Sequence, residues 1–65
     1  MDRWYCRVQA EGLGTRRVVL EAANVHDARD AARQWAQDRN GFKAVYDVQV
    51  ASAPRSLRLG VINDL

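Results

Sequence analysis

One segment of this sequence has the apolar spacing of an amphipathic helix, and it limits the folds that the rest can adopt. Its apolar residues recur at intervals of three and four, which places on one face Ala28, Ala31, Ala32, Trp35 and Ala36. Asn24 precedes the run as a helix N-cap, and Asn40-Gly41 follows it with the glycine that closes a helix C-terminus. Because small alanine side chains let a helix lie close to a sheet, we predict one helix over residues 24–41, packed on strands.

The segments on either side of this helix alternate between apolar and polar residues, as half-buried strands do. Residues 3–10 and 16–22 are two such segments, and the short glycine-bearing loop between them suits a hairpin. Residues 42–51 alternate again, and their predicted buried face carries Phe42, Ala44, Tyr46, Val48 and Val50. Pro54 ends this strand because proline has no N–H to donate. Residues 55–65 are predicted to hold a final edge strand or a docking tail.

The predicted order of elements is strand, strand, helix, strand, followed by the tail strand. A right-handed crossover places the third strand beside the first, which gives an antiparallel sheet of order 2-1-3, with the tail strand outside the third. We therefore predict a single two-layer α+β domain over residues 1–65, with the helix on one face and the other face open. A domain this small buries only about 60% of its unfolded surface, so both a monomer and a homodimer are compatible with the sequence.

The reactive side chains argue against an enzyme, a cofactor and a metal site. His26 is the single histidine and is expected on the helix surface, whereas Cys6 is the single cysteine and is expected in the core. A metal site needs three or four convergent ligands, and no such spacing is present. A lone cysteine cannot form an internal disulfide, and no apolar run reaches the roughly 20 residues of a membrane span. These features predict a cytoplasmic protein that does not bind membranes.

Arginine and tyrosine side chains are predicted to share the open face of the sheet. This combination holds phosphates and stacks bases in single-strand nucleic-acid binders, and it is equally enriched at protein–protein hot spots. A solvated face of mixed charge is the third interpretation, because Glu21 and Asp47 interrupt the positive charge and the net charge is only +2. The helix adds a like-charge pair at i, i+4. The residues predicted to contact a partner are Tyr5, Arg7, Arg17, Arg29, Arg33 and Lys43.

The run from Val19 to Ala32, with the strand at 42–50, resembles the core of very small phage-encoded anti-CRISPR proteins that act on type I surveillance complexes. The resemblance covers about half of the chain and is carried by Glu21, Ala22, Ala23, Asn24, Ala28, Arg29 and Ala32. It implies a stoichiometric inhibitor in the host cytosol that binds Cas protein subunits of a Cascade-like complex. Such an inhibitor would block target DNA hybridisation or recruitment, with contact to guide RNA or target DNA. The residues themselves leave open a second hypothesis, a small nucleic-acid-binding module that uses the Arg/Tyr sheet face.

Overall fold

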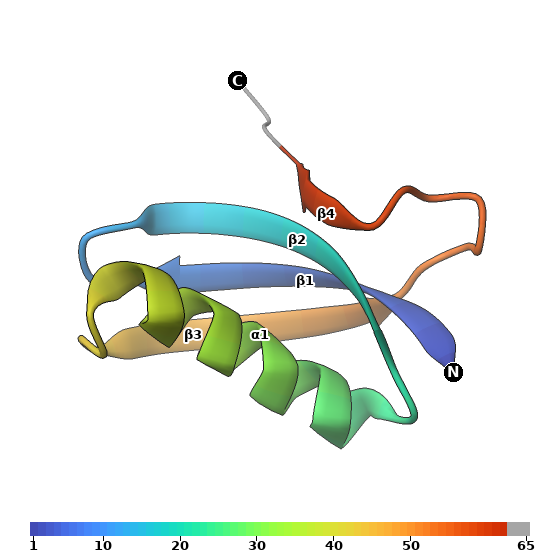
Figure 1. Ribbon diagram of the computed structural model, residues 1–65, viewed down its shortest axis with the longest axis horizontal. Helices are drawn as coiled ribbons and strands as arrows, with labels where there is room; N and C mark the ends of the chain where they lie inside the picture. The colour runs from blue at the N-terminus through green and yellow to red at the C-terminus, as the bar shows by residue number, and fades with distance from the viewer. Residues whose placement is uncertain (63–65) are drawn as a thin grey trace.

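The computed structural model describes residues 1–62 as one helix packed on a four-stranded antiparallel sheet. The elements are β1 (Asp2–Ala10), β2 (Gly14–Ala22), α1 (Val25–Asn40), β3 (Val45–Ser52) and β4 (Gly60–Ile62). Figure 1 shows α1 lying across one face of the sheet formed by β1, β2 and β3. The shortest dimension, 15 Å, is the thickness of one helix layer on one sheet layer. The predicted two-layer α+β fold is therefore confirmed.

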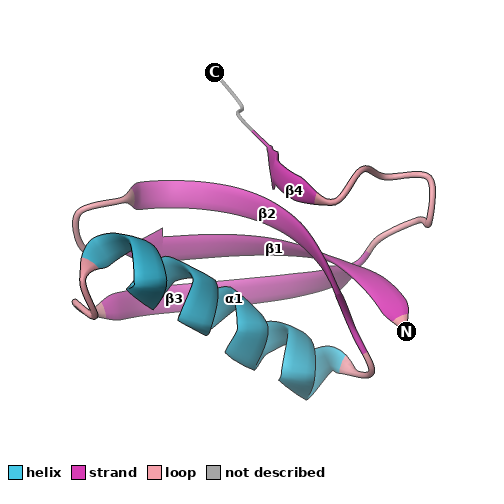
Figure 2. Ribbon diagram, viewed as in Figure 1, coloured by secondary structure: helices cyan, strands magenta, loops and turns pink. Residues whose placement is uncertain are grey.

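The order of the strands agrees with the prediction for the first three and differs for the last. Strand β1 lies between β2 and β3 and is antiparallel to both, which confirms the order 2-1-3. Strand β4 was expected outside β3, but it pairs with β2 at the opposite edge, and the full order is β3-β1-β2-β4. The reason is the length and path of the connection after β3, which Figure 2 shows as a long loop. Ala53 N–H donates to Arg3 O, and the turn at 54–57 then leads the chain away from β3.

Local side-chain chemistry sets both ends of α1. Asn24 accepts a hydrogen bond from the Asp27 N–H at 2.9 Å, which satisfies one of the donors left open at a helix start. Gly41 ends the helix in the left-handed conformation, with φ of 70°, and its N–H donates to Gln37 O. The buried face of the helix is narrow, because Ala28, Ala32 and Ala36 are fully covered, whereas Trp35 is only partly buried.

The core lies between this alanine stripe and the sheet residues Cys6, Val8, Ala10, Val18 and Val48. At the start of β3 the pairing with β1 slips by one residue: Ala10 lies opposite Val45, whereas Gln9 lies opposite Asp47. Tyr46 is the extra residue of this β-bulge, so Val45 takes the inward position instead.

Because of the bulge and the later start of β3, part of the predicted buried face of this strand is wrong. Tyr46 is 66% exposed and Phe42 is 72% exposed, so neither belongs to the core, and Ala44 is exposed as well. Phe42 lies outside the strand in the left-handed region, with φ of 62°, because the chain is still leaving the helix cap there. The expected inward positions of Val48 and Val50 are confirmed.

Candidate binding site on the sheet face opposite the helix

The face of the sheet that turns away from α1 carries the polar positions of the strands. In the register of β1 and β2, Arg3 lies opposite Glu21, Tyr5 opposite Val19, and Arg7 opposite Arg17. On the other side of β1, Gln49 of β3 lies opposite Arg7. A cluster of arginine, tyrosine and glutamine side chains therefore extends across three neighbouring strands.

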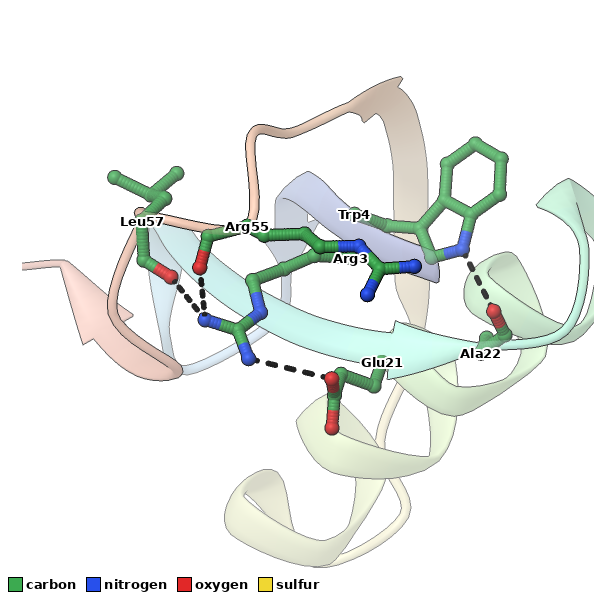
Figure 3. A network of polar contacts seen from close by, with 6 residues as sticks. All are labelled: Arg3, Trp4, Glu21, Ala22, Arg55 and Leu57. Atoms are coloured by element: carbon green, nitrogen blue, oxygen red, sulfur yellow. Dashed lines mark hydrogen bonds and ion pairs between the residues drawn. The ribbon is translucent and has the colours of Figure 1, made fainter. Parts of the chain in front are cut away.

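The connection to β4 covers one end of this face. Val19 points away from the helix, yet it is only 2% exposed, so the same chain buries it from the other side. The guanidinium of Arg3 holds the connection in place, since Nη1 donates to Arg55 O at 2.8 Å and to Leu57 O at 2.7 Å. Its Nη2 donates to Glu21 Oε2 at 3.2 Å, as Figure 3 shows. The expectation that the whole face is open is therefore wrong at this end, because the tail passes over it.

Figure 3 also shows how the neighbouring residue of β1 is tied to the sheet. The indole N–H of Trp4 donates to Ala22 O at 3.0 Å, at the point where β2 ends and the chain turns toward α1. Trp4 packs against the core on the helix side, while Arg3 binds the tail on the opposite side. Consecutive residues of β1 thus contact the core on one face and the connection to β4 on the other, at the same end of the sheet.

The part of the face that the connection leaves uncovered contains a shallow cavity of about 230 Å³. Its lining consists of Tyr5, Arg7, Arg17, Gln49, Val50 and Ala51. Within residues 1–62, this lining has two arginines and no carboxylate. Pockets for whole small molecules usually measure about 300–1,000 Å³, so this cavity suits one small group of a larger partner.

Arg7 is the most unusual charge of this cavity. Its side chain is half-buried, and its Nε atom is covered and has no hydrogen-bond partner within residues 1–62. It lies directly opposite a second arginine, and like charges in that relation repel each other. The sheet thus presents a partly desolvated positive charge beside an aromatic ring.

The structure divides the six predicted contact residues into three groups. Tyr5, Arg7 and Arg17 come together at the cavity. Arg29 and Arg33 are exposed on α1, which covers the opposite face of the sheet, so they belong to a different surface.

Lys43 was expected on the open face as part of the third strand. It lies instead in the exposed loop before β3, where its backbone N–H donates to Asn40 Oδ1 at 3.0 Å. Gln49 was not among the predicted contacts, although its polar position in the alternation of β3 and the register opposite Arg7 mark it.

The reactive side chains offer no catalytic arrangement in the part of the chain that the structure describes. Cys6 is fully buried, and desolvation raises the pKa of its thiol above the ordinary value of 9.0, which keeps it protonated and unreactive at neutral pH. His26 is exposed in the first turn of α1. No three His, Cys, Asp or Glu side chains among residues 1–62 lie close enough to hold a metal ion. None of the described helical segments has the length and apolarity needed to cross a bilayer.

Comparison with known proteins gave no match to a family model, to a curated protein or to a solved structure.

Proposed function

We propose that this chain is a non-catalytic domain that acts by occupying a surface of a larger assembly. The observation that supports the proposal is the cavity on the sheet face, where the covered Nε atom of half-buried Arg7 lacks a hydrogen-bond partner within residues 1–62 and lies beside Tyr5. Arginine and tyrosine are the side chains most often found at the energetic centre of protein interfaces. A guanidinium already partly removed from water loses less hydration when a carboxylate or phosphate pairs with it.

On the resemblance to small anti-CRISPR proteins, we propose that this assembly is a type I surveillance complex, with Cas protein subunits as the partners. The two longer extents of the domain are 30 and 27 Å, so most of one broad face must be buried to reach the roughly 800 Å² that each partner contributes to a standard protein interface. A domain with that footprint can inhibit stoichiometrically by covering the path of target DNA. In this proposal Tyr5, Arg7 and Arg17 make the central contacts.

Size-exclusion chromatography of the purified chain with a type I surveillance complex tests this proposal. We expect the chain to co-elute and to block target DNA binding at one or a few copies per complex. The sheet-face variant Arg7→Ala/Arg17→Ala should lose both effects. Arg29→Ala/Arg33→Ala carries the same change of charge on the helix and should keep them. Absence of co-elution with any type I complex would reject the proposed target.

A nucleic-acid-binding module is the second candidate, and one observation favours it. Arg3 and Glu21 pair with each other outside the cavity, whose lining contains Arg7 and Arg17 beside Tyr5. Titration of the free chain with a labelled single strand at low and high salt tests this function. Binding through phosphates must weaken steeply as salt rises, and a complete lack of binding at low salt would exclude it.

A further inference from the structure

We propose that the cavity between β1, β2 and β3 is a subsite for one phosphate group of a nucleic-acid strand, with Tyr5 stacking against the adjoining base. The inference deepens the second candidate function, nucleic-acid binding, and rests on the sheet face as the binding surface. It does not depend on which assembly carries the strand.

Arg7 and Arg17 form a directly opposed cross-strand pair in an antiparallel ladder. Residues in that relation have Cβ atoms about 4.5–5.5 Å apart, and two like charges there destabilise the sheet. Both side chains are half-buried, so water screens the repulsion less than at an open surface. An anion bound at the Arg7 guanidinium would offset this repulsion by an attraction.

The described part of the chain does not itself supply that anion to Arg7. No carboxylate lines the cavity, and the covered Nε atom of Arg7 lacks a partner within residues 1–62. Glu21 is engaged by Arg3, and Asp47 lies opposite Gln9, outside the cavity lining. Arg17 has a further contact within the protein, so Arg7 is the cavity arginine that remains to be paired among residues 1–62.

The donors around the cavity suit a phosphate held from several directions. Arg7 projects from β1, Arg17 from β2 and Gln49 from β3, and guanidinium groups bind phosphate oxygens in a bidentate manner. All three positions lie within regular strands, so the backbone fixes their spacing before a ligand arrives. The volume of about 230 Å³ admits a single anionic group of this kind.

Tyr5 is the reason to prefer a nucleic-acid phosphate to a carboxylate of an acidic peptide. Its half-buried ring lies in the same cavity lining, two residues from Arg7 on the same face of β1. A base attached to the bound phosphate can stack on this ring, and such stacking tolerates any base sequence. An acidic peptide would use the arginines and leave the ring without a planar partner.

The test uses the free, full-length chain and no surveillance complex, so its failure is separate from failure of the proposed target. Fluorescence anisotropy at low salt compares an oligothymidine and an oligouridine of eight nucleotides with an acidic octapeptide. We expect Arg7→Gln to weaken binding of the strand at least tenfold and to reduce the salt slope by about 1. Arg16→Gln removes the same charge from an exposed position on β2 and should change affinity less than twofold. The two strands distinguish DNA from RNA as the source of the phosphate.

Two further measurements separate a phosphate subsite from a structural arginine. Inorganic phosphate should shift the amide resonances of Tyr5, Arg7, Arg17 and Gln49 in a ¹H–¹⁵N spectrum and leave those of α1 in place. Because Arg7→Gln relieves a like-charge pair, it should raise Tm by about 2–5 °C while weakening binding. The inference is overturned if the peptide binds as tightly as the strands or if neither strand binds. Equal effects of Arg16→Gln and Arg7→Gln, or a lower Tm for Arg7→Gln, would overturn it as well.

Discussion

Replacing Arg3 by methionine should release the C-terminal connection and β4 from the sheet without unfolding the rest. The Arg3 guanidinium makes two short hydrogen bonds to carbonyl groups of this connection, at 2.7 and 2.8 Å. Bonds to a charged donor contribute about 1.5–3 kcal/mol each, and partial exposure of Arg3 places them at the lower end. The ion pair with Glu21 adds less than about 1 kcal/mol, since the Glu21 side chain is 42% exposed.

These contributions set the size of the expected effect. Because the methionine can repack partly, the free energy of local opening of the tail should fall by about 2 kcal/mol, which is roughly a 30-fold change in the opening equilibrium. Native-state amide hydrogen exchange measures this directly. We expect protection of the amides in residues 60–62 to fall by that factor, while the amides of β1 and β3 change little. Val19, now covered, should become accessible.

Two variants make this measurement specific. Arg58→Met removes an exposed arginine from the same connection and should leave the protection of β4 unchanged. Arg3→Lys keeps the charge but lacks the forked geometry needed to reach both carbonyls, so it should behave like Arg3→Met. Wild-type protection of residues 60–62 in Arg3→Met would refute the idea that this side chain holds the tail.

Three other predictions concern the stability of the fold. Asn40→Ala removes a side chain that is 8% exposed, that donates to Glu11 O and that accepts from Lys43 N–H, both at 3.0 Å. Urea titration should show that the free energy of unfolding falls by about 2 kcal/mol, and a fall below about 0.5 kcal/mol would contradict the bridging role. Val8→Ala opens a cavity at a position that is 1% exposed, so the same titration should show a loss of about 2 kcal/mol, and a neutral result would mean that the core collapses around the gap. The pKa of the Cys6 thiol is raised in the folded state, so below the ordinary value of 9.0 its contribution to the free energy of unfolding is fully present. This contribution is lost as pH rises through the folded-state pKa, because the thiol of the unfolded chain ionises first. The stability of Cys6→Ala should therefore depend less on pH above 9.0, and identical slopes for the two proteins would exclude this linkage.

The parts of the fold that were predictable from the sequence depend on local chemistry. Asn24 and Gly41 end the helix through contacts with residues three or four positions away, and these rules can be read along the chain. The alternation in β1 and β2 placed Arg7 and Arg17 on the correct face, since both strands pair without interruption over nine residues. The central position of β1 followed from the handedness of the crossover.

The parts that were not predictable depend on contacts between distant residues. Asn40 Nδ2 donates to Glu11 O across 29 positions, and the conformation of the loop after the helix delays β3 until Val45. Because β3 begins only at Val45, Lys43 lies in the preceding loop and not on the sheet face. The tail is placed by the Arg3 contact with Leu57, 54 positions away, and no periodicity encodes such a pair. Gln49 joins the site only through the register of β3 against β1, which alternation alone leaves undetermined.

The extra residue at Tyr46 has a consequence for how these molecules behave at high concentration. Strand β3 forms one outer edge of the described sheet, and a long regular edge offers unpaired N–H and C=O groups on which strands of other copies can assemble. The bulge interrupts that row near its start, and the exposed carboxylate of Asp47 follows directly after it. The β3 edge is therefore a poor template for strands of other copies, and we expect the chain to resist edge-to-edge assembly at high concentration.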